Sequence, residues 1–497
     1  MRLRSSPWLI LCDVGSIPGF EEASNEDNAD TNTNTSTSKT DSEFPSLSQA
    51  ATATAASTKK HYDLTPHLSY MRNLQQRQPT RNALERFGMG YQDYLQAPLQ
   101  PLTVNLESIT YEVFEKDPIK YDWYERAIAS ALYDWAEQKK PTSDPKNNKV
   151  VVAVVGAGRG PLVARALRAS AQTGVDIDMW ALEKNPNAFV LLQRHNEFSW
   201  DRKVSLVQSD MRSWRGPQRD NGTEGESLST AATITTTTGV GGKVEETSQY
   251  THIDILISEL LGSFGDNELS PECLDGVTHL LNPVHGISIP SSYSSHLTPI
   301  STPKLHADVT AMSSTNPAAP ETPYVVMLHA IDFLSTLSAL SSADPLDNNY
   351  YTGPPPAMTA FHKPLPTTTP LVQTAWSFSH PNKNMTYQQQ QPLIGITNSH
   401  NVRETRLKFP CQNHGVCHGL AGYFESVLYK DVELSTNPVT MDSKSANMIS
   451  WFPIYFPLKV FLAFCFFFFP LCANILIDTT EYSRQFRTSS HHVPKNR

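Results

Sequence analysis

Short apolar runs separated by amphipathic stretches mark the middle of the chain. They cover residues 150–155, 177–182, 204–208 and 253–257. Residues 123–138, before the first run, and 162–170, after it, follow a helical pattern. An unbroken run such as 150–155 is typical of a strand buried on both faces of a parallel sheet. The alternation predicts an open α/β domain with helices packed against a parallel sheet.

The pattern changes after residue 286. Residues 287–290, 324–328 and 422–429 are alternating or punctuated by proline, which is typical of antiparallel β structure. A second nucleotide-binding half does not follow the first. We therefore expect a separate β domain in the second part of the chain.

An aromatic stripe precedes the first predicted strand. Residues 82–100 carry apolar side chains at helical spacing, namely Leu84, Phe87, Tyr91, Tyr94 and Leu95. The spacing predicts a helix. Core packing is the default role of such a stripe, and a border of a substrate site for Phe87, Tyr91 and Tyr94 is the alternative.

Three stretches have few large apolar side chains. Residues 21–60 are rich in Ser, Thr, Asn and Asp, residues 215–250 in Gly, Thr and Glu, and residues 341–400 in Pro, Thr and Gln. Such segments bury too little surface to offset the entropy of ordering them. We expect them to be inserts in domains that span residues 1–72, 73–285 and 286–459, with an apolar tail over 460–497.

Charge and cysteine content narrow the function. The 497 residues have a net charge of −9 and a pI of about 6.0, which argues against direct nucleic-acid binding and favours the approach of basic protein tails. Six scattered cysteines without a CxxC pair indicate reduced thiols in a cytosolic or nuclear compartment. Cys411, His414, Cys417 and His418 lie too close in sequence for an unstrained tetrahedral site, so we expect no metal.

The ends of the first three predicted strands carry residues suited to a nucleoside cofactor. The turn with Gly156, Gly158 and Gly160 lets a ligand approach the backbone, a signal that NAD enzymes and methyltransferases share. Glu183 can accept hydrogen bonds from two ribose hydroxyls, Asp210 from an adenine amino group, and Met211 can lie on the base. This order fits S-adenosylmethionine better than a dinucleotide.

Two glutamates follow the fourth strand. Glu259 and Glu268 bracket a glycine-containing loop, and a carboxylate pair facing one pocket suits a planar cation such as an arginine guanidinium. Acids at the start of a helix are the simpler explanation of an isolated pair. The three cofactor-type strand ends upstream favour the pocket.

Several stretches together resemble one known family. Residues 111–121, 154–162, 183–188, 209–212 and 258–276 are similar to the catalytic domain of the type II protein arginine methyltransferases, and the similarity runs from about residue 82 to 459. It implies a Rossmann-like class I methyltransferase domain followed by an antiparallel β-barrel/oligomerisation domain. The implied activity is transfer of methyl groups from S-adenosylmethionine to arginine, giving mono- and symmetric dimethylarginine.

The resemblance also implies residue roles. It implies that the cofactor contacts the Gly156–Gly160 turn and Tyr111, Lys120, Tyr121, Glu183, Asp210 and Met211, with Lys120 neutralising the cofactor carboxylate. Glu259 and Glu268 match the paired catalytic glutamates, which would grip the guanidinium and aim one nitrogen at the methyl group. Phe114 matches the aromatic residue that directs symmetric dimethylation. Ser450, Trp451 and Phe452 match a loop near the substrate.

Family resemblance further implies the partners. The implied substrates are Arg/Gly-rich proteins, histone tails and RNA-processing proteins. The protein itself would be a homo-oligomer in the cytoplasm and nucleus. Longer members carry an N-terminal TIM-type barrel that binds a WD-repeat partner. This chain has at most a final fragment of it in residues 7–72, which puts that partnership in doubt.

The other end of the chain also departs from the family. Residues 460–477 are apolar and near the minimum length for a membrane anchor, but an aberrant terminus that leaves sheet edges exposed is the preferred interpretation. A catalytically inactive scaffold that keeps the fold for dimerisation is the main alternative function. A small-molecule methyltransferase or an NAD enzyme would not explain the paired glutamates.

Overall fold

A computed structural model describes residues 66–77, 86–219, 249–337, 369–382, 398–411, 415–464 and 473–478. The chain divides into two compact units, residues 1–81 and 82–497. Helix α2 (Pro66–Gln76) lies in the first unit and spans the boundary expected at residue 72. The predicted insert at 21–60 and most of those at 215–250 and 341–400 lie outside the described residues.

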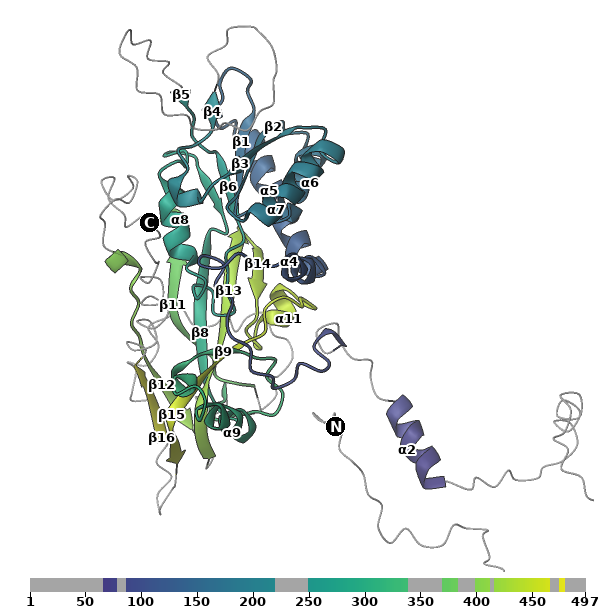
Figure 1. The fold of residues 1–497 in the computed structure, drawn as a ribbon, viewed down its shortest axis with the longest axis vertical. Coiled ribbons are helices and arrows are strands. Elements are labelled where there is room, and N and C mark those ends of the chain that lie inside the picture. Colours follow the sequence, from purple (N-terminus) through teal and green to yellow (C-terminus); the bar gives the residue numbers. More distant parts are fainter. Residues whose placement is uncertain are drawn as a thin grey trace, which may run out of the picture. The chain divides into compact units, whose positions relative to one another are not determined.

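A five-stranded parallel sheet forms the first part of the larger unit, as the apolar runs predicted (Figure 1). Its order is β3-β2-β1-β6-β7, made of β3 (Val204–Gln208), β2 (Ile177–Glu183), β1 (Val150–Val155), β6 (Ile255–Ser258) and β7 (Ile287–Ile289). The prediction that residues 287–290 are antiparallel was wrong, because Ile287 pairs in parallel with Ile255. A run of three residues is too short for its pattern to distinguish the two.

Helices cover both faces of this sheet. Successive side chains of β1 point to opposite faces and all are apolar, so both faces have to be buried. Val152 and Val154 pack toward a cluster formed with α5 (Pro118–Glu137), α6 (Pro161–Thr173) and α7 (Pro186–Phe198). Ala153 and Val155 join a second cluster with α8 (Ser270–Thr278). Each face of the strand is therefore buried, and the polar strand ends are left at one edge of the sheet.

The second part is an antiparallel sheet, which confirms the predicted change of class. Long strands β8 (Ser292–Ser301) and β13 (Gly415–Tyr429) lie at its centre (Figure 1). They are joined by β15 (Ile454–Phe464), β9 (Tyr324–Val325), β10 (Asp332–Phe333), β11 (Gln373–Ser379) and β14 (Val432–Ser435). Strand β11 lies within the segment expected to be an insert, where it pairs with β8.

The sheet structure continues past Lys459. Strand β15 pairs with β13 as far as Phe464, and β16 (Ala473–Asp478) pairs with β12 (Arg406–Cys411). Within the described ranges, no helix combines the length and apolar character needed to cross a bilayer. The apolar tail thus contributes β strands where it is described.

The aromatic stripe does not form the predicted helix across residues 86–100. Gln92 and Gln96 instead form β-bridges with Met327 and Val325 of the second domain, and Gly90 has a left-handed φ of 98°. The buried Asp93 accepts backbone hydrogen bonds from His329 and Ala330. Pairing with a distant segment has overridden the local helical pattern.

The remaining elements are short. They are α4 (Ser108–Glu115), η2 (Met211–Ser213), β4 (Gln218–Arg219), β5 (Gln249–Tyr250), α9 (Pro303–Met312), η3 (Ala319–Glu321), η5 (Asn398–Asn401) and α11 (Met441–Lys444). Helix α4 and the start of α5 matter most for function, because they face the polar edge of the parallel sheet.

Candidate active site

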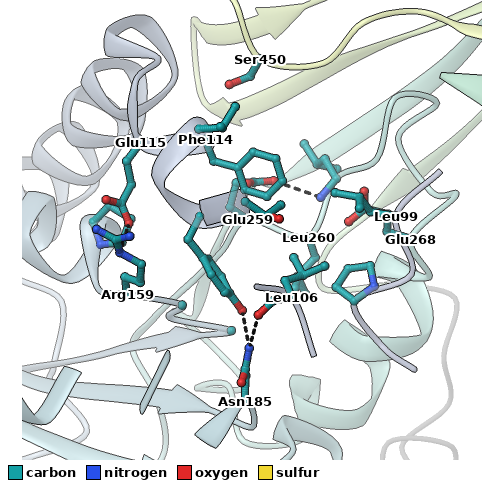
Figure 2. A pocket seen from close by; sticks show the side chains of 18 of the residues that line it. Leu99, Leu106, Phe114, Glu115, Arg159, Asn185, Glu259, Leu260, Glu268 and Ser450 are labelled. Atoms are coloured by element: carbon teal, nitrogen blue, oxygen red, sulfur yellow. Dashed lines mark hydrogen bonds and ion pairs between the residues drawn. The ribbon is translucent and has the colours of Figure 1, made fainter. Parts of the chain in front are cut away.

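A cavity of about 700 Å³ lies at the carboxyl ends of the parallel strands (Figure 2). Both domains line it. All but one of the predicted site residues are among the lining residues, which include Tyr111, Phe114, Lys120, Tyr121, Gly156, Gly158, Glu183, Asp210, Met211, Glu259, Glu268, Ser450, Trp451 and Phe452. The structure therefore brings together the four strand ends and the loop with Ser450, Trp451 and Phe452, called the late loop below.

The glycine turn between β1 and α6 forms one wall. Gly156 and Gly158 have left-handed φ values of 72° and 56°, and a Cβ on Gly158 would lie 3.0 Å from the Tyr111 ring. Only glycine keeps this wall open. Gly160 is the exception among the predicted residues: it does not line the cavity, and a Cβ there would lie 2.5 Å from Trp200. Its role is close packing of α6.

Glu183 ends β2 beside this turn. Its Oε2 accepts a hydrogen bond from the Gly158 N–H at 2.7 Å, and its Oε1 accepts one from the Asn185 N–H at 2.7 Å. Burial raises the pKa of Glu183 despite these bonds. The backbone of Lys184 also donates to Glu183, and a carboxylate has about four lone-pair sites, so the side chain can hold the turn and still accept from a ligand hydroxyl.

Asp210 is held by a neighbouring arginine. The side chain of Arg212 donates to Oδ1 at 3.0 Å and to Oδ2 at 2.7 Å. Burial alone would raise the pKa of Asp210, but the bonds from Arg212 lower it overall. The carboxylate thus stays ionised as an acceptor at the cavity wall.

A tethered segment, residues 102–106, lines the cavity near Tyr111. Lys184 Nζ donates to the Leu102 carbonyl at 2.5 Å. Asn185 Nδ2 donates to the Leu106 carbonyl at 3.0 Å and to the Tyr111 hydroxyl at 3.3 Å (Figure 2). Leu102 and Leu106 both line the cavity. Sequence reasoning missed this tether, although the two polar residues directly after Glu183 were a signal.

Other lining residues were also missed. Arg159 forms an ion pair with Glu115 at 3.2 Å above the glycine turn. Cys273 lines the cavity, and burial raises the pKa of its thiol to about 12. Of the aromatic stripe, Phe87 and Tyr91 line the cavity, whereas Tyr94 is exposed elsewhere.

The described cysteines Cys273, Cys411 and Cys417 are buried, and none of the three is in a disulfide. Within the described residues, which do not include His414, no three metal-ligating side chains lie close enough together to hold an ion.

The paired glutamates line the cavity from the loop that follows β6, the strand beside β1 and its glycine turn. Glu259 directly follows β6, and the Tyr124 hydroxyl fixes this strand end by donating to the Ser258 carbonyl at 2.9 Å. Glu259 Oε1 accepts from the Leu261 N–H at 3.2 Å. Burial, and then the charge of Glu259, raises the pKa of Glu268 well above its ordinary value. Because the two negative charges repel each other, a cation bound between the carboxylates would favour ionisation of both.

Lys120 supplies a cation to this part of the cavity. Its buried Nζ lies 3.3 Å from Glu259 Oε2 and 5.1, 4.9 and 4.8 Å from the ring centroids of Phe114, Tyr121 and Trp451. Burial alone would lower the pKa of Lys120, but Glu259 raises it overall. The three rings and the carboxylate therefore form a site that accepts a positive charge. The predicted contact of Lys120 with a cofactor carboxylate stays a prediction.

The late loop comes from the second domain. Trp451 has a left-handed φ of 63°, and its Nε1 donates to the Leu261 carbonyl at 2.7 Å. The Phe452 ring lies 6.3 Å from the Phe87 ring. A strained, hydrogen-bonded tryptophan at a cavity indicates a loop held for function.

Fold and cavity together define a Rossmann-like methyltransferase with an antiparallel second domain. The model of the PRMT5 arginine-N-methyltransferase matches residues 82–289, and that of the PRMT5 oligomerisation domain matches residues 292–465. The chain belongs to this arginine methyltransferase family. The second match extends six residues beyond the limit of similarity expected at residue 459.

Individual relatives agree with the family models. The chain is 43% identical over 390 residues to protein arginine N-methyltransferase skb1 of Schizosaccharomyces pombe, covering 78% of this chain and 49% of that protein. It is 40% identical over 400 residues to protein arginine N-methyltransferase 5 of Xenopus laevis, covering 80% and 49%. The chain thus spans about half the length of the curated relatives it matches.

Proposed function

We propose that the protein is an S-adenosylmethionine-dependent protein arginine N-methyltransferase. One observation carries the proposal: the two glutamates and the three aromatic rings around the Lys120 ammonium line the same cavity as a glycine turn and a strand-end acid. A guanidinium is planar, permanently charged and able to donate to two carboxylates at once.

The residues around the glycine turn suit the cofactor. Gly156 and Gly158 leave room against the backbone, Glu183 is a strand-end acceptor for the ribose, and Asp210 is an ionised acceptor for the adenine amino group. S-adenosylmethionine, when bound, supplies an electrophilic methyl group. The tethered Leu102 and Leu106 would exclude water from it.

The two glutamates would divide the work on the substrate. Both carboxylates accept from the guanidinium, which fixes its plane and concentrates electron density on the nitrogen that reacts. A bound guanidinium favours the ionised form of Glu268. Because burial raises its pKa, Glu268 is the group we assign to accept the proton released from the arginine.

We also propose a symmetric dimethylarginine product. The Phe114 ring lies 5.1 Å from Lys120 Nζ, which is paired with Glu259, so the bulk of the ring would limit how a monomethylated guanidinium bound at Glu259 rotates. The second methyl would then be added to the other terminal nitrogen.

Partners and compartment are further proposals. Arg/Gly-rich segments, histone tails and RNA-processing proteins are the substrates we propose, because they carry the basic, flexible sequences that an acidic protein attracts. The match to an oligomerisation domain supports a homo-oligomer. We propose action in cytoplasm and nucleus.

Incubation with a radiolabelled methyl donor and an Arg/Gly-rich peptide tests the proposal. We expect label on this peptide and none on a matched peptide with lysine in place of arginine. Cofactor binding without any transfer of label would instead support the inactive scaffold. Label on both peptides would contradict the arginine selectivity.

A further inference from the structure

Asp117 joins the two domains next to the cation site. It precedes α5 as the N-cap, is 1% exposed, and is not among the residues that line the cavity. Its Oδ1 accepts hydrogen bonds from the backbone N–H of Ile119 at 2.9 Å and of Lys120 at 3.1 Å. This half of the carboxylate caps the helix that carries Lys120 and Tyr121.

The other half holds the late loop. Asp117 Oδ2 accepts from the backbone N–H of Ile449 at 2.9 Å and of Ser450 at 2.6 Å. Both residues line the cavity and directly precede Trp451. One buried carboxylate therefore accepts four backbone hydrogen bonds, two from each domain, which occupies its lone pairs.

We propose that Asp117 is a positioning residue that sets the distance between Trp451 and the other two rings of the cation site. Trp451 has a left-handed φ, which a non-glycine residue keeps only when its surroundings hold it. Asp117 holds the backbone before it, and the Leu261 carbonyl holds its indole N–H. The Asp117 carboxylate thus holds both the start of α5 and the late loop. The expected effect on substrate binding rests on the proposed arginine specificity.

The substitution Asp117→Ser separates the two roles of the Asp117 carboxylate, the helix cap and the hydrogen bonds to the late loop. Serine is a good N-cap, so α5 keeps its first hydrogen bonds, but its oxygen is one bond too short to reach Ile449 and Ser450. Asp117→Asn keeps the shape and replaces one oxygen with an amide nitrogen, which opposes a donor to two of the four N–H groups. Asp134→Asn is the matched control: Asp134 lies near the other end of α5 and bonds to Tyr429 and Lys430 of the second domain.

Amide hydrogen exchange of a peptide covering residues 445–453 is the first readout. We expect exchange at least tenfold faster in Asp117→Ser and Asp117→Asn than in the wild type, and unchanged exchange there in Asp134→Asn. Equal exchange in wild type and Asp117→Ser would overturn the proposal. This readout does not depend on catalysis.

Ligand affinity is the second readout. We expect the Kd of an Arg/Gly-rich peptide, measured with S-adenosylhomocysteine present, to rise about tenfold in both Asp117 variants, and the Kd of S-adenosylhomocysteine in Asp117→Ser to stay within twofold. An equal loss of both affinities would reduce Asp117 to a general structural role. A wild type that binds no peptide would refute the proposed function, while the exchange result would still decide whether Asp117 anchors the loop.

Discussion

At the scale of single residues, the two glutamates sit in unlike surroundings. Glu259 has a cation and a backbone N–H as partners, whereas burial and the charge of Glu259 disfavour ionisation of Glu268. When the surroundings of two neighbouring carboxyl groups give them different pKa values, that difference is a common basis for assigning their roles. Glu259 is thus suited to anchor the guanidinium, and Glu268 to take up its proton.

The substitution Glu268→Gln tests this assignment. We expect methyl transfer to fall by at least 10²-fold, because the amide can neither balance the guanidinium charge nor accept its proton. Cofactor affinity, measured by calorimetry, should change little, since the proposed cofactor contacts, among them Glu183 and the glycine turn, do not include Glu268. A joint loss of cofactor binding and turnover would point to a structural role.

The raised pKa of Glu268 predicts a pH dependence. Arginine stays charged throughout, so the acid limb of kcat/KM for the peptide, at saturating cofactor, reports the enzyme. Activity should rise with pH as Glu268 ionises, with a midpoint above the ordinary carboxyl value of 4.5. The limb for kcat should lie lower, because the bound cation favours the carboxylate. A kcat/KM that is flat down to that value would contradict the assignment.

Phe114→Met tests the proposed product. A flexible thioether leaves more room than a rigid ring, so a monomethylated guanidinium could rotate and receive its second methyl on the same nitrogen. We expect asymmetric dimethylarginine to appear beside the symmetric form in fragment mass spectra. An unchanged ratio of products would remove Phe114 from this role.

At the scale of elements, the strand ends were predictable and the connections were not. Strands β1, β2, β3 and β6 are local apolar runs, so their pattern and the polar residues after them could be recognised from sequence. Residues 86–100 and strand β11 depend on pairing with segments far away in the chain. Local periodicity does not contain that information.

The candidate site divides in the same way. Glu183, Asp210, Glu259 and Glu268 could be predicted to line one cavity, because each follows a predicted strand and their types and order resemble a family. The tether from Lys184 and Asn185 and the anchor at Asp117 were missed, because each is a contact between a side chain and a backbone group 79 to 333 residues away. Such contacts leave no spacing to recognise.

Substitutions of Asn185 test the tether between the start of α7 and the residues that line the cavity. Asn185→Ser keeps a capping oxygen at the start of α7 but loses the reach to Leu106 and Tyr111. We expect the Kd for S-adenosylhomocysteine to rise roughly tenfold, from about 1.4 kcal/mol of lost tethering. Asn185→Ala, which also removes the cap, should add a loss of thermal stability. An unchanged Kd in the serine variant would show that the segment needs no tether.

At the scale of the whole larger unit, the two domains share a core. Leu428, Val432 and Leu434 of the antiparallel sheet pack in one buried cluster with Tyr124 and Leu132 of α5. The same helix carries Lys120 into the cavity and bonds through Asp134 to Tyr429. The cation site is therefore assembled only when both domains are folded.

Leu434→Ala should affect both domains together. Leu434 is fully buried, and truncation of such a side chain typically costs about 2–5 kcal/mol of unfolding free energy. Hydrogen exchange in denaturant should show β1 and β14 losing protection in one step and at lower denaturant than in the wild type. Val402→Ala, at an exposed position, is the control and should change little. Loss of protection in β14 alone would show that the domains fold independently.

Tandem mass spectrometry of an Arg/Gly-rich peptide, after incubation with the wild-type chain and S-adenosylmethionine, tests the proposed arginine methylation most directly. We expect a mass gain of one and then two methyl groups, located on different terminal nitrogens of one arginine. A peptide of unchanged mass, despite cofactor binding by the same preparation, would contradict the claim that Glu259 and Glu268 form a working arginine methylation site.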